Sequence, residues 1–257
     1  MSDDKDIKIL VASHKLYDMP RDPVYMPIWV GARINPPKRF TPDDSGDNIS
    51  KKNKNYCELT AVYWAWKNLE AEYVGLSHYR RYFKGTLPFS VNGKNFGILS
   101  GYEAEGHLDK YPVILPRKRN YYIETTYSQY AHAHHARDLD TARRVLEDFY
   151  PEYVDVFDAL MKKTSGHKFN MFVMKKDVFD SYCRWLFDVL FEVEKRLDIS
   201  GYSENDSRVF GFVAERLLDV WVETNGVLYT ELPVVNLEDQ HWDRKIFSFL
   251  KRKLTSK

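Results

Sequence analysis

The chain has 257 residues, of which 44% are hydrophobic and 29% charged, and its 38 basic side chains nearly balance 37 acidic ones. This composition is typical of a globular protein and excludes a disordered or fibrous chain. The two cysteines, Cys57 and Cys183, fit neither a disulfide framework nor a zinc pattern. The acidic N-terminus lacks the apolar run of a signal peptide, and no apolar stretch reaches the roughly 18 residues of a membrane span, so we expect a cytoplasmic protein.

Strand-like and helix-like segments alternate along the first third of the chain. The pattern predicts a buried strand at 7–12, a long ordered loop at 17–55 with a short helix or strand at 28–32, a helix at 57–69 and a strand at 73–78. A helix followed by a buried strand is typical of βαβ units.

The remainder of the chain continues this alternation. It predicts a strand at 111–115, two short helices between 140 and 160, a strand at 169–174, a long helix capped by Asp177, a helix from Ser207 and a last extended segment at 227–235. Strands separated by helices predict a single α/β domain, over residues 1–241, with an open, mostly parallel sheet flanked by helices.

Residues 242–257 form a basic C-terminal tail. From Arg244 to Lys257 there are six basic residues and no acidic one, and apolar residues between them fall mainly on one helical face. Such a helix suits the surface of an anionic membrane, although an ordinary solvated or frayed helix fits the same pattern. Because the rest of the chain is net acidic, nucleic-acid binding is disfavoured.

Two adjacent arginines, Arg80 and Arg81, follow the predicted strand at 73–78. Ligands bind beyond the carboxyl ends of the strands in open α/β sheets. Paired guanidinium groups flanked by aromatic rings suit a diphosphate and the stacking of a base or sugar. The alternative is a surface ion-pair site. The predicted strand at 7–12 ends in a similar way, in the polar residues Ser13, His14 and Lys15.

Acidic residues also form two clusters, one in the polar loop Asp43–Ser50 and one around Asp138 and Asp140. The loop lacks the ligand spacing of a calcium site, so we expect it to turn on Gly46 and either cap the next helix or contact a ligand. Asp138 and Asp140 form a DxD triplet near three histidines (132, 134 and 135), which is a candidate site for Mn²⁺ or Mg²⁺. We favour the simpler interpretation, in which Asp140 caps a helix that begins after it.

Further candidates lie later in the chain. The amide of Asn170 either binds a sugar hydroxyl or is a satisfied core group, and Met171 follows it. Asp206 and Glu215 lie at and within the helix that starts near Ser207, where a carboxylate facing a cleft could act as a general base. The alternative is that Asp206 is a cap and Glu215 the partner of an arginine. The chain contains no GxGxxG, GxxxxGK or GxSxG motif.

Several strings resemble a bacterial family that is catalogued as a domain of unknown function in capsular and exopolysaccharide biosynthesis, with members described as glycosyltransferases. They are SHK (13–15), GDNIS (46–50), Asn53, CELT (57–60), YWAWKN (63–68), GLSHYRRYF (75–83), NMF (170–172), RVFGF (208–212) and ERL (215–217). The resemblance spans nearly the whole chain.

The resemblance implies a GT-A-like (Rossmann-like) hexosyltransferase. It would move a sugar, with galactose or galactofuranose among the candidates, from a nucleotide diphosphate sugar, UDP-sugars being favoured. The acceptor would be a growing capsular, exopolysaccharide or lipopolysaccharide glycan, free or lipid-linked, at the inner face of the membrane. The strand that normally ends in a metal-binding DxD ends here in HYRRYF, so Arg80 and Arg81 would neutralise the diphosphate without, or alongside, Mn²⁺ or Mg²⁺.

These arguments predict one site. Its catalytic residues would be Arg80, Arg81, Asp206 and Glu215, and its donor-binding residues His14, Lys15, Asp47, Asn48, Ser50, Asn53, His78, Tyr79, Asn170 and Met171, with Asp138 and Asp140 as weak metal candidates. The main alternative is a carbohydrate- or nucleotide-binding module without catalysis in a polysaccharide assembly complex. A His/Asp metal hydrolase ranks below both.

Overall fold

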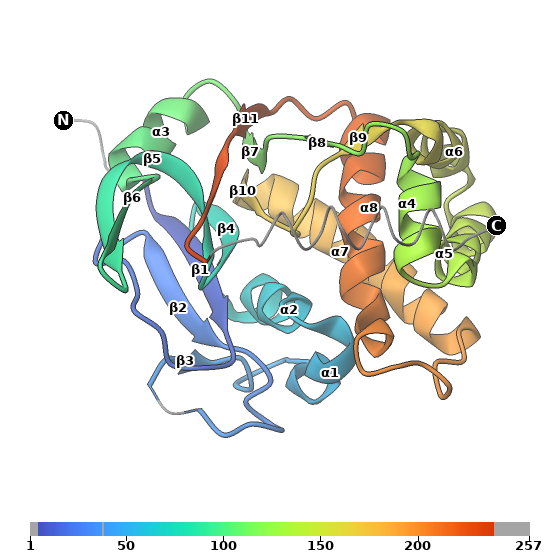
Figure 1. Ribbon diagram of the computed structural model, residues 1–257, viewed down its shortest axis with the longest axis horizontal. Coiled ribbons are helices and arrows are strands. Elements are labelled where there is room, and N and C mark those ends of the chain that lie inside the picture. The colour runs from blue at the N-terminus through green and yellow to red at the C-terminus, as the bar shows by residue number, and fades with distance from the viewer. Residues whose placement is uncertain (1–4, 38, 239–257) are drawn as a thin grey trace.

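Ten strands form one mixed sheet in the computed structural model, which describes residues 5–37 and 39–238 (Figure 1). The central strands lie in the order β11-β7-β10-β4-β1-β2-β3. The strands are β1 (Ile7–Ser13), β2 (Tyr25–Trp29), β3 (Thr41–Pro42), β4 (Tyr73–His78), β5 (Arg81–Val91), β6 (Lys94–Ile98), β7 (Val113–Pro116), β10 (Phe172–Lys175), β11 (Thr230–Leu232) and β12 (Val234–Asn236), and a separate pair joins β8 (Arg119–Asn120) to β9 (Ser165–Gly166).

The pairing of the strands is mostly parallel in the centre of the sheet. β1 runs parallel to β2 and β4, β2 parallel to β3, and β7 parallel to β11. β10 runs antiparallel between β7 and β4, and β5 leaves β4 through a tight turn to pair antiparallel with β6 and β12. This topology confirms the predicted α/β domain with an open, mostly parallel sheet flanked by helices. The predicted tail at 242–257 lies outside the described residues.

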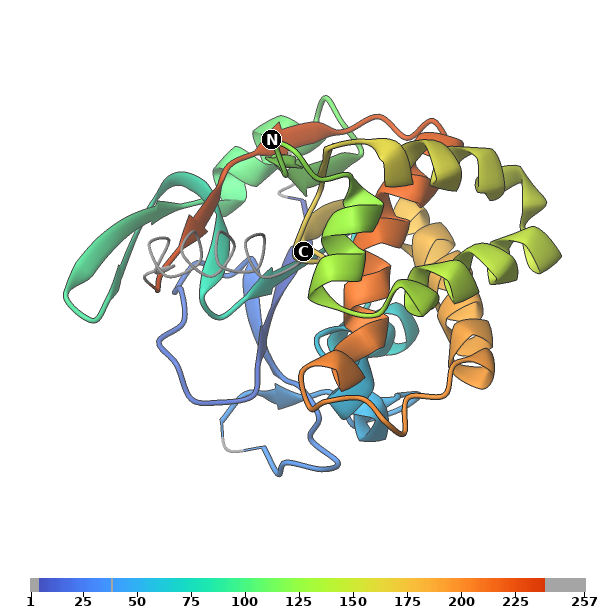
Figure 2. The same cartoon turned by 45° about the vertical axis from the view of Figure 1, so that its right-hand side comes forward.

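Helices flank the sheet. They are α1 (Asn53–Tyr56), α2 (Leu59–Asn68), α3 (Gly101–Leu108), α4 (Thr126–Ala133), α5 (Ala136–Phe149), α6 (Val154–Lys162), α7 (Lys176–Arg196) and α8 (Val209–Thr224), with short 3₁₀ turns η1 (Ser50–Lys52), η2 (Pro151–Tyr153) and η3 (Asp206–Arg208). In Figure 2 the helices α4, α5 and α6 gather beside α8, and the teal β5–β6 hairpin projects on the opposite side. No helix in the described ranges combines the length and the apolar character needed to cross a bilayer.

Side chains of the central strands alternate between two cores. On β1, Leu10 and Ala12 belong to the core built with α2, α7 and α8, whereas Ile9 and Val11 belong to the core that includes residues of α3 and the β5–β6 hairpin. Successive side chains of a strand point to opposite faces, so both faces of this strand are buried. That explains why the strand reads as a continuous apolar run in the sequence.

The predicted boundaries were wrong in several places. The expected loop at 17–55 contains β2, which overlaps the short element predicted at 28–32, and also β3, η1 and most of α1. The β5–β6 hairpin, α3 and α4 were not predicted. Asp140 does not cap a helix, because α5 already begins at Ala136, and Asp177 lies inside the first turn of α7, which begins at Lys176.

Asp43 ties the segment after β2 to helix α2. Its side chain is fully buried and accepts hydrogen bonds from the backbone N–H groups of Gly31 (2.8 Å) and Ala32 (3.0 Å) and from the hydroxyl groups of Ser50 (2.5 Å) and Thr60 (2.6 Å). Four donors on one buried carboxylate compensate for its lost hydration. The acidic loop is therefore held from inside the protein.

Replacing Asp43 tests this role. We expect Asp43→Ala to lower the free energy of unfolding by about 3–5 kcal/mol, because four buried donors lose their acceptor at once. Urea denaturation at pH 7 measures the change. Asp44→Ala is the matched control, since Asp44 pairs with Arg33 at the surface (3.4 Å) and should cost less than about 1 kcal/mol. Equal losses in the two variants would contradict the structural role of Asp43.

Candidate functional site

A pocket of about 670 Å³ opens at the carboxyl ends of β1 and β4, opposite helices α4 and α8. Ala12 on β1 pairs with His78 on β4, so the polar residues that follow both strands meet there. The pocket wall includes His14, Asn53, Lys54, Cys57, Glu58, His78, Tyr79, Arg80, Arg81, Arg119, Gln129, His134, Lys168, Phe169, Glu204, Arg208, Phe212, Glu215 and Arg216. Its position matches the predicted location of the site in the sheet.

Positive charge dominates this pocket. Seven lysine or arginine side chains line it, against three glutamates. A cleft lined by one sign of charge raises the local concentration of ligands of the opposite sign. An anionic ligand therefore fits this site better than a neutral or cationic one.

Arg81 has an unusual environment among these cations, and Arg216 shares part of it. Its Nε is buried without a hydrogen-bond partner among the described residues, and its guanidinium lies 4.6 Å from the centre of the Phe169 ring. Burial, and then the neighbouring charge of Arg80, lower the pKa of Arg81. Arg80 is more exposed, and its Nη1 lies 3.1 Å from Oε2 of Glu238. The turn between β4 and β5 thus presents one partly exposed guanidinium and one desolvated guanidinium to the pocket.

Aromatic rings and backbone carbonyls contact the other residues at the ends of β1 and β4. His14 meets Tyr79 edge to face, with ring centres 5.6 Å apart, and the Tyr79 N–H donates to the carbonyl of Ala12. Nε2 of His78 lies 2.7 Å from the carbonyl oxygen of Phe169. Burial, and then the charges of Lys15 and Arg80, lower the pKa of His14, so this ring is neutral at pH 7.

The segment before β10 is strained. Phe169 and Asn170 have φ values of +80° and +52°, a region that non-glycine residues seldom occupy. Asn170 is almost fully buried, and its Nδ2 donates to Oε1 of Glu58 (2.7 Å) and to the carbonyl of Gly211 (3.0 Å), while its Oδ1 has no hydrogen-bond partner among the described residues. Such strain persists only where surrounding contacts enforce it, and it is concentrated at functional sites. Asn170 lies behind the pocket wall and positions Glu58.

The far wall comes from α4, α8 and the segment before Asn170. Arg216 is buried, and its Nη1 lies 2.7 Å from Oε2 of Glu215, while its Nη2 donates to Oε1 of Gln129. Lys168 also donates to Oε1 of Gln129 (3.1 Å). Burial, and then the positive charge of Arg216, lower the pKa of Lys168 to about 7. Glu215 faces the pocket as predicted, but as the ion-pair partner of an arginine.

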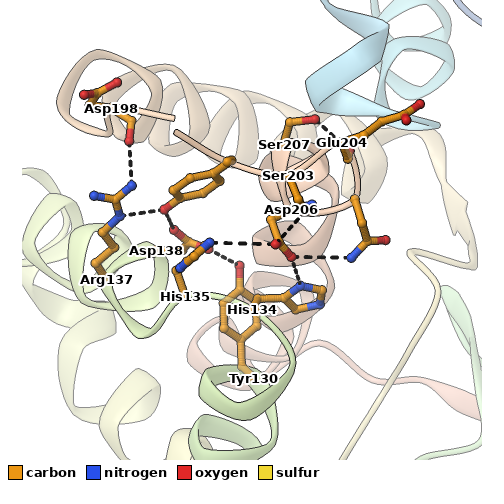
Figure 3. A network of polar contacts seen from close by, with 12 residues as sticks. Tyr130, His134, His135, Arg137, Asp138, Asp198, Ser203, Glu204, Asp206 and Ser207 are labelled. Carbon is orange, nitrogen blue, oxygen red and sulfur yellow. Dashed lines mark hydrogen bonds and ion pairs between the residues drawn. The ribbon is translucent and has the colours of Figure 1, made fainter. Parts of the chain in front are cut away.

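The predicted metal residues are occupied by other contacts (Figure 3). Asp138 is buried and accepts hydrogen bonds from the hydroxyl groups of Tyr130 (2.9 Å) and Tyr202 (2.5 Å). Asp140 accepts one from Tyr127 (2.9 Å). Neither carboxylate lines the pocket, and within residues 5–37 and 39–238 no three His, Cys, Asp or Glu side chains are grouped so as to hold a metal ion. The DxD triplet therefore does not fit a metal bound in this pocket.

Asp206 does not reach the pocket either, but lies behind one of its residues. Its Oδ1 is 3.2 Å from Nδ1 of His134, and its Oδ2 accepts a hydrogen bond from Ser203 (2.7 Å). These hydrogen bonds, first that from Ser203, lower the pKa of Asp206 and keep it ionised at neutral pH. Figure 3 shows Asp206 between Ser203 and His134. Asp206 therefore contacts His134 and is not part of the pocket wall.

Other predicted donor residues lie outside the pocket wall, namely Lys15, Asp47, Asn48, Ser50 and Met171. Ser50 donates to buried Asp43, Asp47 accepts from the hydroxyl of Tyr63, and Asn48 donates to backbone carbonyls of its own loop. Lys15 lies beside the Tyr79 ring and Glu238, and Met171 is buried in the core. His14, Asn53, His78, Tyr79, Arg80, Arg81 and Glu215 do line the pocket.

The predicted set lacked several pocket residues, among them Lys54, Glu58, Arg119, Gln129, His134, Lys168 and Arg216. His134 was noted only as a metal candidate, and Gln129 belongs to a helix that was not predicted. No pattern in the sequence shows that Lys168 and Arg119 line the same pocket as Arg81, because this depends on long-range packing.

Comparison with known proteins adds two findings. A family model described as "Domain of unknown function (DUF4422)" matches residues 8–226. The chain is also similar to the apo structure of the WbbM bifunctional glycosyltransferase, with 30% sequence identity and a TM-score of 0.82. That match covers 91% of this chain and 46% of the other, so this chain spans about half the length of that protein. No curated protein matches the chain.

The buried Nε of Arg81 leads to a test that needs no ligand. We expect Arg81→Met to leave the free energy of unfolding within about 1 kcal/mol of wild type or to raise it, because the guanidinium is desolvated beside Arg80 and its Nε is unpaired, while methionine keeps the contact with Phe169. Urea denaturation at pH 7 checks this. As a contrast, Arg143→Met breaks a two-bond pair with Asp158 (2.8 Å each) and should be destabilising by about 0.5–1 kcal/mol. A loss above about 2 kcal/mol in Arg81→Met would make Arg81 a structural anchor.

Proposed function

The chain belongs to the DUF4422 family, and we propose that it is a glycosyltransferase that uses a nucleotide diphosphate sugar. The similarity to a solved bifunctional glycosyltransferase supports the reaction class. We expect a UDP-sugar as the donor, with galactose or galactofuranose as candidate sugars, and a glycan or lipid-linked glycan of a bacterial surface polysaccharide as the acceptor. These finer assignments come from the resemblance described above.

The arginine pair after β4 carries the proposal. Arg81 keeps a buried Nε without a partner among the described residues, and it faces a pocket in which cations outnumber carboxylates. A buried, unsatisfied donor costs about 1–3 kcal/mol, so its retention points to a ligand that completes the contact. Guanidinium groups match the oxygen spacing of phosphates in two-bond geometry. A diphosphate is therefore the group that this turn fits best.

The donor would span the pocket from the strand ends to the helices. We place its diphosphate on Arg80 and Arg81, where charge develops as the bond between the sugar and the phosphate breaks. Preorganised donors at such a position stabilise the transition state by about 3–4 kcal/mol each, by analogy with oxyanion sites. Tyr79 and His14 are suited to the nucleoside, and Glu58, which Asn170 holds in place, is suited to a sugar hydroxyl.

The proposed mechanism uses no divalent metal, because the carboxylates of Asp138 and Asp140 accept hydrogen bonds from tyrosine hydroxyls away from the pocket. The proposal assigns the neutralisation of the diphosphate to side chains of the protein. It therefore makes Mn²⁺ a variable of the first experiment below.

Nucleotide binding is the first test. We expect UDP to raise the melting temperature more than GDP, CDP or dTDP does, by roughly 5–10 °C at a concentration 100 times its dissociation constant, because such a ligand stabilises by about 2.7 kcal/mol. A thermal-shift screen with and without Mn²⁺ measures this. A shift that requires Mn²⁺ would contradict neutralisation by arginines alone, and the absence of any shift would contradict a nucleotide site.

Turnover is the second test. Release of UDP from UDP-galactose, UDP-galactofuranose and UDP-glucose should fall roughly 10²–10³-fold in Arg80→Ala and Arg81→Ala, because each change removes a donor from the leaving group. Arg184→Ala, on an exposed part of α7, is the matched control and should keep wild-type turnover.

The binding and turnover experiments together also distinguish the proposed enzyme from the alternative function. Saturable binding of UDP by the wild-type protein without release from any donor would favour a binding module without catalysis. A loss of activity that only follows the unfolded fraction of each variant would remove the arginine assignment.

A further inference from the structure

His134 is held in one orientation at the corner between α4 and α5. It is the residue after the last turn of α4, and its ring stacks on Phe212 of α8 with ring centres 4.1 Å apart and planes at 21°. Its side chain is only 13% exposed, yet it lines the cationic pocket. A surface histidine has no such clamp, so the ring orientation is set by the fold.

Asp206 fixes which nitrogen of this ring carries the proton. Nδ1 lies 3.2 Å from Oδ1 of Asp206, and an ionised carboxylate only accepts hydrogen bonds, so Nδ1 is the donor (Figure 3). Ser203 holds the other carboxylate oxygen, and His135 approaches it at 3.8 Å. Nε2 points away from Asp206, since the two ring nitrogens diverge, and it has no hydrogen-bond partner in the described part of the chain. It is left as an acceptor.

The surroundings of His134 also keep the ring neutral. Burial is the first cause of its lowered pKa, and Arg216 acts in the same direction, while Asp206 and Asp138 oppose them. The ring of Tyr130 packs beside it, and Phe212 covers one face. At pH 7 the imidazole is therefore unprotonated at Nε2.

We propose that His134 is the general base of the transfer reaction, with Asp206 as its positioning residue. This inference rests on the proposed glycosyltransferase function and deepens it. A neutral histidine oriented by a carboxylate, with its second nitrogen free, is the arrangement that activates hydroxyl nucleophiles in hydrolases on unrelated folds.

The proposed transfer is a single displacement at the anomeric carbon. Nε2 takes the proton of the acceptor hydroxyl while that oxygen forms a bond to the anomeric carbon. The bond from that carbon to the phosphate oxygen breaks, and its electron pair leaves on the nucleoside diphosphate at Arg80 and Arg81. The imidazolium that forms keeps its Nδ1–H on Asp206, whose charge stabilises it. Attack from the side opposite the leaving group inverts the anomeric centre.

Two of the three glutamates that line the pocket, and Asp206, are held by other contacts. Glu215 is paired with Arg216 at 2.7 Å. Glu58 accepts a hydrogen bond from Asn170. Asp206 does not line the pocket.

Two substitutions test the base. His134→Gln and His134→Phe should lower kcat roughly 10²–10⁴-fold, the usual share of general acid–base catalysis, and leave the dissociation constant for UDP within about twofold. His134→Phe keeps the ring stack on Phe212, which separates the lost nitrogen from lost packing. His132→Gln is the matched control, because His132 lies two residues away, exposed and paired with Glu124. The assay measures UDP release and product from UDP-galactose and UDP-galactofuranose, with octyl galactosides or water as acceptors.

The pH profile tests the pair. In the wild type kcat should fall as His134 gains a proton, at a pH below the ordinary histidine value of 6.5. Asp206→Asn removes a carboxylate that raises the pKa of His134, so the acid limb should move to lower pH while kcat falls tenfold or more. A purely structural role for Asp206 would lower the folded fraction without moving this limb.

The outcomes separate the inference from the function on which it rests. Variants of His134 with kcat within threefold of wild type, while Arg81→Ala is inactive, would overturn the base and leave the glycosyltransferase standing. A product of retained anomeric configuration would do the same. Failure of wild type to use any donor would remove both proposals.

A measurement on the protein alone completes the test. Histidine-¹⁵N NMR should show the proton on Nδ1 of His134. The signal of His134 is identified by its absence in His134→Phe. Protonation at Nε2 would overturn the inference without an activity assay.

Discussion

Parallel pairing of β1 with β4, with Ala12 opposite His78, brings the two polar strand ends together. Everything in the pocket depends on this register. A shift of one residue would turn Leu10 and Ala12 from one core to the other, and the alternating apolar faces of both strands resist that shift. The same register sets the β4–β5 turn, and this turn carries Arg80 and Arg81 to the rim of the pocket.

Local strain accompanies this arrangement. Besides Phe169 and Asn170, Cys57 has a positive φ (+52°), and it lies against the pocket, where its Sγ accepts a hydrogen bond from Arg208. These residues come from two separate segments of the chain, one after α1 and one before β10. Each unfavourable backbone geometry costs of order 1–3 kcal/mol, which the two cores on either side of the sheet offset. The fold therefore supports the pocket at the expense of stability.

The sequence predicted the site best where function follows from strand position. His14, His78, Tyr79, Arg80 and Arg81 were identified because each lies at or just after the end of a strongly apolar strand, and the structure places all five at one pocket. The acidic loop does turn on Gly46, which has a positive φ (+54°). The role of Asp43 was not predicted, because its hydrogen-bond donors come from residues as far apart as Gly31 and Thr60, and a sequence does not show which carboxylate is buried.

Some missed elements did carry local signals. Asn92-Gly93, with φ values of +50° and +74°, is a typical hairpin turn, and Ser100 with Glu103 forms a capping box at the start of α3. No local signal identifies His134, because its proposed role depends on the contact with Asp206, which lies 72 residues away in the chain. Long-range pairing of that kind follows only from the tertiary fold.

The excess of cations around Arg81 has a consequence for the timing of the proposed reaction. The charge that attracts a nucleotide sugar does not decrease when the sugar leaves, and a nucleoside diphosphate carries more negative charge than its sugar ester. The spent nucleotide would thus be held more firmly than the fresh donor. Departure of that product, and the cellular level of free nucleotide, would then govern the pace of the enzyme more than the chemistry does.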